Sequence, residues 1–159
     1  GSIYACFLLG LEDDEDILPA LSFLVRELNA PFNGHSNSLI PVPERGSACK
    51  RLNLFLRWMV RKDNVDPGGW NEVSPAMLII PLDIHMHRIC LGLGLTDRKN
   101  TGIKTALDIT KAFREIFPQD PVRYDFALTR LGIRKDADPG VFIRGAWKPG
   151  QTHKTPELI

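Results

Sequence analysis

The stretch "GSACKRLNLFLRWMVR", residues 46–61, sets the fold class of this chain. Its apolar residues recur at spacings of three and four, at Leu52, Phe55, Leu56, Met59 and Val60. This spacing places them on one face of an α-helix. Gly46 ends the connector that precedes the helix, and Lys50 lies one turn inside the helix start.

The start of this helix is a candidate anion site. A glycine-terminated connector that runs directly into a helix leaves the first backbone N–H groups pointing outward. Lys50 then has three interpretations: a solvated lysine, a phosphate ligand, or a nucleophilic amine if it is partly desolvated. Residues 45–62 hold six basic residues and no acidic one. Such a stripe indicates a polyanion partner only weakly, since a solvated helix face has the same composition.

The composition of the whole chain is that of one soluble globular domain. Of its 159 residues, 43% are hydrophobic and 25% are charged, and this length suffices for a sizeable core. The three cysteines form no CxxC motif, which argues against a disulfide framework and favours the cytoplasm. The apolar residues 3–11 are too few to span a bilayer, so no membrane partner is expected.

Helical patterns follow one another along the chain and strand patterns are scarce. We predict helices over residues 13–29, 46–61, 75–80 with Ser74 as its cap, 81–92, 100–117 and 120–132, separated by loops at 30–45 and 61–73. Asn100 or Thr101 is the expected cap of the fifth helix, and Asp120 that of the sixth. From Arg134 the sequence predicts an irregular surface extension. The fold class predicted is all-α.

Asp83 in "IIPLDIHMHRI", residues 79–89, is a second candidate functional residue. It is read as a helix cap or dipole partner, or as a carboxylate at the mouth of a cleft beside an apolar wall. His85 and His87 cannot share a metal ion on a helix, because positions two apart point about 200° apart. Asp83 and His87 could, but no third ligand is indicated, and no metal is predicted.

The aromatic residues divide into core and ligand candidates. Trp58 stands at helical spacing with apolar neighbours, so packing in the core or at its edge is expected. Trp70 lies in a glycine-rich loop and is the better candidate for stacking on a ligand. Tyr124 and Phe126 are expected to anchor the core.

The motifs described above resemble those of a known superfamily. "GSACKRLNLFLRWMV" followed by "IIPLDIHMHRICLGLGL" resembles the helix-hairpin-helix DNA glycosylases, which include endonuclease III, adenine-mismatch glycosylases and 8-oxoguanine glycosylases. The matching positions are Gly46, Lys50 and Asn53 in the hairpin element, and Asp83, His85, Arg88 and the following "LGL" in the catalytic element. With "DPVRYDFALTRLG", these segments look more closely like an uncharacterised bacterial family of conserved hypothetical proteins, over residues 3–133.

Several features depart from the superfamily pattern. Ala48 stands where the second hairpin glycine is usual, which would weaken the phosphate cradle. The span between Lys50 and Asp83 is longer than in endonuclease III, although archaeal 8-oxoguanine glycosylases also have a long span. The four-cysteine iron–sulfur loop is absent. Only 45 residues precede the hairpin, so part of the N-terminal region of the superfamily fold is expected to be missing.

The resemblance implies a fold and an activity. The fold is a multi-helix orthogonal bundle over residues 3–133, with the hairpin and catalytic elements in 43–95 and an irregular extension over 134–159. The activity is that of a base-excision DNA repair glycosylase/AP lyase acting on a flipped damaged base, without a cofactor. Lys50 would be the nucleophile and Asp83 the carboxylate that stabilises positive charge on the sugar. The implied DNA contacts are Arg45, Gly46, Ser47, Arg51, His85 and Arg88, and the implied base contacts are Trp70 and His87.

Two other functions stay open at this point. One is a non-catalytic nucleic-acid-binding module with the same fold, and the other is a metal-dependent hydrolase that uses Asp83 and His87. The expected partner is duplex DNA carrying a damaged or abasic nucleotide, bound by a cytoplasmic, nucleoid-associated monomer. The identity of the base cannot be read, because the walls of the pocket come from several helices and loops.

Overall fold

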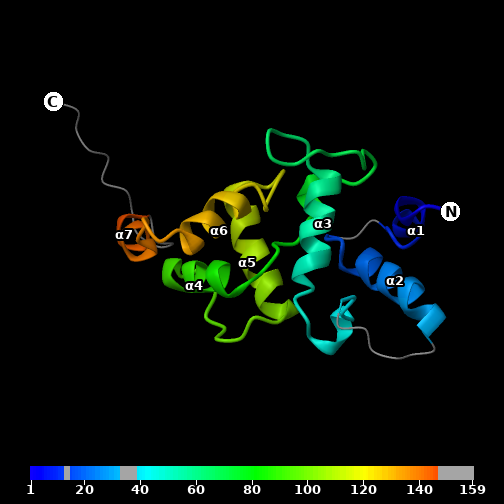
Figure 1. The fold of residues 1–159 in the computed structure, drawn as a ribbon, viewed down its shortest axis with the longest axis horizontal. Coiled ribbons are helices and arrows are strands. Elements are labelled where there is room, and N and C mark those ends of the chain that lie inside the picture. Colours follow the sequence, from blue (N-terminus) through cyan, green and yellow to red (C-terminus); the bar gives the residue numbers. More distant parts are fainter. Residues whose placement is uncertain (13–14, 33–38, 147–159) are drawn as a thin grey trace.

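The computed structural model describes residues 1–12, 15–32 and 39–146 (Figure 1). These residues form the α-helices α1 (Ile3–Leu9), α2 (Leu18–Asn29), α3 (Lys50–Val60), α4 (Ile84–Leu93), α5 (Ile103–Ile116), α6 (Asp125–Ile133) and α7 (Pro139–Gly145). Short 3-10 helices lie at η1 (Ala30–Phe32), η2 (Pro43–Arg45) and η3 (Pro75–Met77). Within these ranges no strand forms, and only two isolated β-bridges occur. The all-α prediction is confirmed.

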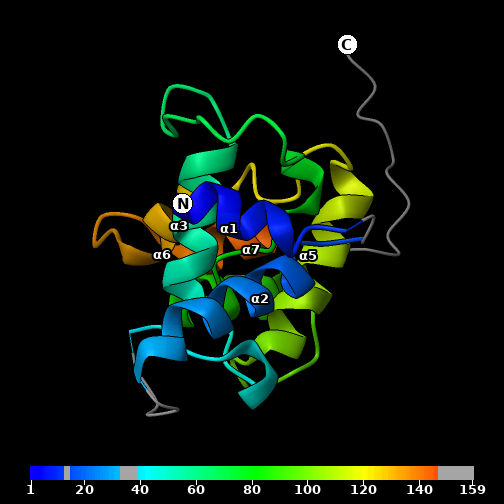
Figure 2. The ribbon, with the colours of Figure 1, turned by 90° about the vertical axis from the view of Figure 1, so that its right-hand side faces the viewer.

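The helix α3 lies at the centre of the molecule. Figure 1 shows α1 and α2 on one side of it and α4 to α7 on the other, and Figure 2 shows α1 and α2 in front of α3 and α5. The chain from 78 to 83 runs extended through the core, where Leu78, Ile79 and Ile80 are fully buried. The Ile80 amide donates to Thr110 Oγ1 of α5 at 3.0 Å. In the described part of the chain, no helix is long and apolar enough to cross a membrane.

The helix predicted over residues 13–29 begins later than expected. Its first residue is Leu18, whose amide donates to Asp16 Oδ1 at 2.8 Å, and Pro19 stands in its first turn. Residues 13–14 lie outside the described residues. Glu15 and Asp16 therefore precede the helix near its positive end rather than lying within it.

The helix predicted at 75–80 forms only over its first three residues, with Ser74 as its cap as expected. Ser74 Oγ accepts from the Ala76 amide and starts only the 3-10 helix η3, after which the chain is extended. Pro81 disfavours the helical conformation at the residue before it. Leu78, Ile79 and Ile80 are consecutive and all buried, so this run does not have the pattern of a helix with one apolar face. The next helix begins at Ile84 rather than Pro81, and Asp83 is its N-cap.

The sixth helix also starts later than predicted. Asp120 accepts from Arg61 Nε at 2.8 Å, and the following residues form turns, so that α6 begins at Asp125. Tyr124 and Phe126 are 41% and 44% exposed, which contradicts their expected place in the core. For α5 the cap is Gly102, and Asn100 supports the turn by accepting from the Gly102 amide at 3.3 Å.

The C-terminal extension contains a helix that was not predicted. Asp138 Oδ1 accepts from the Gly140 amide at 2.7 Å, and Pro139 is the first residue of α7. Ile143 lies so close to Gly92 of α4 that a Cβ there would approach it to 2.7 Å. The expectation of an irregular chain from Arg134 is therefore wrong for residues 139–145, while 147–159 lie outside the described residues.

A buried ion-pair cluster fixes the loop that follows α3. Arg57 and Arg61 both bind the fully buried carboxylate of Asp66, and Arg57 also binds Asp125 of α6. The amides of Gly68 and Trp70 donate to Trp58 O and Met59 O at 2.9 and 2.8 Å. The loop predicted at 61–73 thus folds back over the C-terminal end of α3.

Candidate functional site

The structure brings Lys50 and Asp83 together, although 33 residues separate them in the sequence. Lys50 Nζ lies 2.7 Å from Asp83 Oδ2, while Asp83 Oδ1 accepts from the Met86 amide at 2.8 Å and caps α4. The Lys50 side chain is 45% exposed and that of Asp83 is 12% exposed. The amine is thus open to a ligand, and the carboxylate behind it is held in place.

The surroundings of Asp83 keep it ionised. Its burial works to raise the pKa, but hydrogen bonds from Lys50 and the Met86 amide, and the charges of Lys50 and His85, work in the opposite direction. The net result is a pKa below the ordinary aspartate value. At neutral pH the group beside Lys50 is therefore a carboxylate.

The hairpin before α3 is held by backbone geometry and by Asn53. Gly46 has a φ of 88°, in the region that favours glycine, and its carbonyl accepts from the Ile103 amide of α5 at 3.0 Å. Buried Asn53 donates from Nδ2 to Ala48 O at 2.9 Å. The non-glycine residue with positive φ in the described chain is Cys49, not Ala48. The backbone at position 48 therefore accommodates a side chain, and no glycine is required there.

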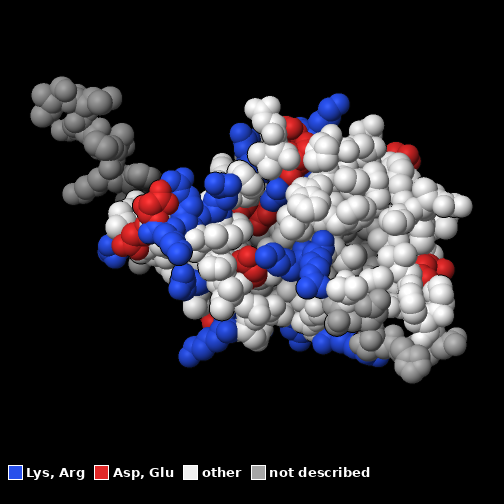
Figure 3. Space-filling model, in the orientation of Figure 1, with Lys and Arg blue, Asp and Glu red and all other residues white. Residues whose placement is uncertain are grey.

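A shallow cavity of about 320 Å³ opens at the start of α3. It is lined by Pro41, Ser47, Lys50 and Arg51. Cys49, the N-cap, makes no side-chain cap hydrogen bond to the first-turn amides. Figure 3 shows basic side chains near the centre of this face, next to acidic atoms, where Figure 1 places α3. This arrangement suits an anion such as a phosphate.

A second cavity, of about 490 Å³, lies between α3 and α6 and has Lys50 at its edge. It is lined by Lys50, Leu54, Arg57, Trp58, Val65, Pro81, Asp125, Phe126, Thr129, Arg130 and Ile133. Trp58 and Phe126 are 42% and 44% exposed, and the Arg130 guanidinium lies over the Phe126 ring. We call this space the α3–α6 cavity. Its exposed aromatic rings offer flat surfaces for a planar ligand.

The two tryptophans occupy the opposite places from those predicted. Trp70 is only 8% exposed and its ring stacks on Tyr4, with centroids 4.9 Å apart, and contacts Phe7 and Phe55. The loop carries it inward because its amide binds the end of α3. Trp70 is therefore a core residue and Trp58 is the tryptophan that faces the cavity beside Lys50.

The other predicted contacts are dispersed around this site. Arg45, Arg51 and Arg88 are exposed, and Ser47 is partly buried. His85 packs beside Gly132 of α6, where an added Cβ would approach its Cβ to 2.8 Å. Gly46 lines a different cavity from the one at the start of α3.

His87 does not reach the α3–α6 cavity. It is buried, and its Nε2 lies 2.7 Å from the Arg98 carbonyl, an arrangement in which the ring nitrogen donates. Neither His87 nor Trp70 lines the α3–α6 cavity. Among the described residues, no group of three or more His, Cys, Asp or Glu side chains is placed to hold a metal ion.

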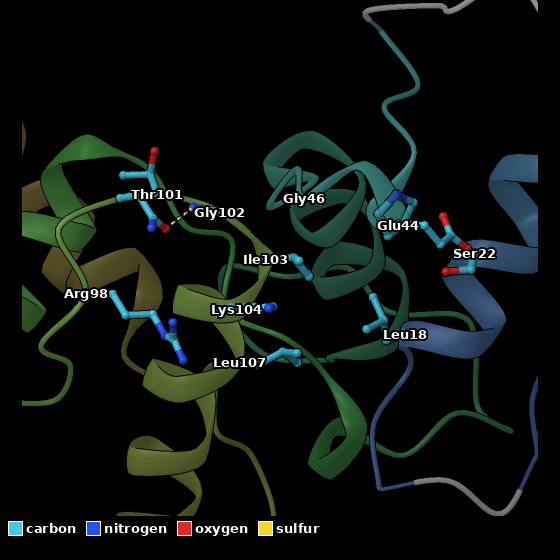
Figure 4. Close-up of a pocket in the computed structure, with 12 residues that line it drawn as sticks. Leu18, Ser22, Glu44, Gly46, Arg98, Thr101, Gly102, Ile103, Lys104 and Leu107 are labelled. Carbon is cyan, nitrogen blue, oxygen red and sulfur yellow. Dashed lines mark hydrogen bonds between the residues drawn. The ribbon is translucent and has the colours of Figure 1, made fainter.

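A larger cavity of about 770 Å³ lies between α2, the hairpin and α5. Figure 4 shows side chains from these three parts around one space, with Arg98 at its edge. Arg98 forms an ion pair with Asp108. Neither Lys50 nor Asp83 lines this cavity, so it is not a candidate site for the chemistry predicted for that pair.

The sequence contains a signal that Trp58 lies beside Lys50 rather than in the core. Leu54, Arg57 and Trp58 follow Lys50 by four, seven and eight residues, and these spacings place the four side chains on one face of α3. Residues 125, 126, 129, 130 and 133 share one face of α6 in the same way. Which helix faces α3 depends on tertiary packing, so the pairing of these faces is visible only in the structure.

Comparison with known proteins places the chain in a family without assigning an activity. No match was found among curated proteins or among solved structures. One family model matches residues 1–134, which include every helix that lines the cavities described above. The chain belongs to this family, which is described as a protein of unknown function (DUF2400).

Proposed function

We propose that this protein is a base-excision DNA glycosylase with AP lyase activity. The observation that carries the proposal is the contact between Lys50 and Asp83, 2.7 Å apart, together with the place of Lys50 in the lining of a cavity with exposed aromatic rings. The resemblance of the hairpin and catalytic motifs to helix-hairpin-helix glycosylases agrees with this reading. The proposed partner is duplex DNA with a damaged or abasic nucleotide, bound by a monomer in the cytoplasm.

The start of α3 would bind the DNA backbone. Ser47, Lys50 and Arg51 line the small cavity there, and Arg45 and Arg88 are exposed for further contacts. Contacts to phosphates fix the register of a protein on DNA without reading its sequence. They would place the C1′ atom of one nucleotide in front of Lys50.

The damaged base would enter the α3–α6 cavity. An enzyme cannot reach the glycosidic bond of a base that is stacked in a duplex, so the nucleotide must rotate outward. Trp58 and Phe126 present rings on which the extruded base can stack, an interaction worth about 1–3 kcal/mol per base. The cavity borders Lys50, so the sugar of that nucleotide would lie beside the amine.

The chemistry follows from the two side chains. Lys50 would first give up a proton to solvent, because an ammonium has no electron pair for a new bond. The neutral Nζ forms a bond to C1′ as the bond to the base breaks, and a proton from the nitrogen neutralises the departing base. Asp83 stabilises the positive charge that develops on the sugar, which requires the carboxylate form that its lowered pKa provides. The Schiff base that follows allows elimination of the 3′ phosphate and breaks the strand.

Strand cleavage at an abasic site tests the proposal. The wild type should cleave a labelled duplex with one abasic site, whereas Lys50→Ala should lose the activity and keep most of its DNA affinity. Arg51→Ala is the matched control, because it removes a positive charge from the same turn of α3 and should weaken binding without abolishing cleavage. Equal cleavage by wild type and Lys50→Ala would refute the proposed nucleophile.

A non-catalytic DNA-binding module is the second candidate function. The observation in its favour is that Lys50 is half exposed and paired with an ionised carboxylate, as in ordinary surface ion pairs. In that case neither protein would cleave the duplex, and Lys50→Ala and Arg51→Ala would weaken DNA binding by similar factors. The slope of log affinity against log salt would fall by about one for each lost phosphate contact.

A further inference from the structure

The cavity between α2, the hairpin and α5 is larger than either cavity beside Lys50. Its volume of about 770 Å³ lies in the range of about 300–1,000 Å³ that is usual for small-molecule sites. Neither Lys50 nor Asp83 lines it, so the proposed chemistry does not use it. We call it the α2–α5 cavity. A small organic ligand has room to bind there.

The walls of the α2–α5 cavity are held together without a ligand. The Gly46 carbonyl of the hairpin accepts from the Ile103 amide of α5 at 3.0 Å, and Ser47 forms an isolated β-bridge with Gly102. Asn100 Oδ1 accepts from the Gly102 amide at 3.3 Å and so fixes the turn that leads into α5. The cavity is therefore preformed, as small-molecule sites usually are.

The floor of the α2–α5 cavity is aliphatic. Figure 4 shows Leu18 of α2 and Ile103 and Leu107 of α5 pointing into the same space, and Pro43 also contributes to the lining. Among the described residues that line this cavity there is no aromatic ring, in contrast to the α3–α6 cavity. Such a floor suits a saturated chain, because each CH₂ group removed from water stabilises the complex.

The charged side chains of the lining are divided between two sides. Arg98 and Lys104 lie on the α5 side, and Glu44 lies on the opposite side near Ser22 of α2 (Figure 4). Arg98 uses Nε for its ion pair with Asp108. In the described part of the chain, neither its Nη groups nor the Lys104 ammonium has a partner. The α5 side therefore offers charged donors to an anionic group.

We propose that the α2–α5 cavity binds a small aliphatic anion, with its saturated chain on the aliphatic floor and its carboxylate or phosphate group at Lys104 and Arg98. Glu44 adds a negative charge to the same lining and opposes the anion, which limits its affinity. The site goes beyond the proposed function and does not depend on it, because the Lys50–Asp83 pair lies outside this cavity.

The charge of the ligand is tested with three probes that share one chain. Octanoate, octanol and octylammonium are titrated into the wild-type protein and their affinities are measured by calorimetry. Octanoate should bind about threefold or more tightly than octanol, the effect of an exposed charge pair, and octylammonium should bind most weakly. Equal affinities, a preference for octylammonium, or no binding of octanoate at millimolar concentration would overturn the proposal.

The chain and the head group are tested in the same way. Butanoate lacks four CH₂ groups of octanoate and should bind about tenfold more weakly if the chain is partly buried on the floor. Equal affinities of the two carboxylates would overturn the assignment of the floor. Octyl phosphate has the same chain as octanoate, and the tighter of the two identifies the preferred head group.

Two lysine variants test the position of the anionic group. Lys104→Ala should weaken octanoate binding about threefold and leave octanol binding unchanged. Lys111→Ala is the matched control, because Lys111 is exposed on the same helix, two turns further along, and does not line the cavity. Glu44→Gln should strengthen octanoate binding. Equal effects of the two lysine variants, or weaker binding to Glu44→Gln, would overturn the assignment.

Amide chemical shifts in the wild-type protein locate the ligand directly. Octanoate added to ¹⁵N-labelled protein should shift the amides of Gly46, Gly102 and Ile103 most, since these residues line the α2–α5 cavity. Largest shifts at Leu54, Trp58 and other residues of the α3–α6 cavity would place the anion beside Lys50 and overturn the proposal. Small shifts spread over the whole surface would also overturn it.

Discussion

The two ends of α3 carry ion pairs of opposite kinds. At its start Lys50 and Asp83 form one pair, half open to solvent on the lysine side. At its other end Arg57 and Arg61 share the fully buried Asp66 and reach Asp125 and Asp120. The buried charges hold the loop after α3 and the floor of the α3–α6 cavity. The pair at the start of α3 fixes no loop; its carboxylate caps α4, and its lysine side chain is 45% exposed.

The largest effect is expected at the buried end. Asp66→Ala leaves Arg57 and Arg61 without their shared partner and should lower the free energy of unfolding by about 3–5 kcal/mol, the usual cost of breaking a buried pair. Asp108→Ala breaks the exposed pair with Arg98 and should cost about 0–1 kcal/mol. Urea unfolding followed by circular dichroism measures both. Similar costs for the two variants would show that the buried cluster does not organise the fold.

The two tryptophans extend the comparison to apolar side chains. Trp70→Ala removes the centre of the aromatic cluster with Tyr4, Phe7 and Phe55 and should cost about 3–5 kcal/mol. Trp58→Ala should cost about 1 kcal/mol or less, because the ring is 42% exposed. Thermal and urea unfolding would detect this difference. A cost for Trp58→Ala as large as that of Trp70→Ala would place Trp58 in the core.

Asp83 should contribute a smaller and pH-dependent stability. Asp83→Ala removes the cap of α4 and should cost about 1 kcal/mol at pH 7, while Asp83→Asn keeps an acceptor and should cost less. The folded pKa lies below the ordinary value of 3.8. The contribution is therefore present above about pH 4 and is lost as the pH falls through the folded pKa.

Urea unfolding of wild type and Asp83→Asn at pH 7 and at pH 2 measures this contribution. The difference between the two proteins should be present at pH 7 and should shrink at pH 2. A difference that grew in acid would contradict the lowered pKa of Asp83.

The smallest effect on stability is expected for Lys50. Lys50→Ala breaks a half-exposed pair and should change the free energy of unfolding by about 0–1 kcal/mol. The same variant should lose all strand cleavage under the proposed function. Unfolding and cleavage measured on one preparation separate these effects. A loss of several kcal/mol would make Lys50 a structural residue.

The sequence predicts the helices that have amphipathic faces and misses the ends that depend on distant contacts. The α3 helix follows from the spacing of Leu52 to Val60, but it begins at Lys50 and not at Gly46, so Lys50 is its first residue rather than one turn inside. The delayed start of α6 depends on Asp120, which binds Arg61 from 59 residues away. No local pattern contains that contact. The helix α7 depends on a short local signal, the Asp138 cap followed by Pro139, within a segment whose overall Pro, Gly and Lys content predicts irregular chain.

For the candidate site, the sequence indicates which residues to consider but not how they are arranged in space. The residue types of Lys50 and Asp83 and their positions near helix starts singled them out, and the structure places them in contact. The α3–α6 cavity could not be predicted, since it forms from faces of two helices more than 60 residues apart. Trp70 lies in the core, contrary to the prediction, because the loop turns at Gly68 and carries its ring inward.

Borohydride trapping followed by peptide mapping tests the central claim most directly. The wild type is incubated with a duplex that contains an abasic site, the Schiff base is reduced, and the cross-linked residue is identified by mass spectrometry. We predict a covalent complex at Lys50, absent in Lys50→Ala and retained in Arg51→Ala. A complex formed through another lysine, or none from a wild-type protein that binds the duplex, would contradict the assignment of Lys50 as the nucleophile.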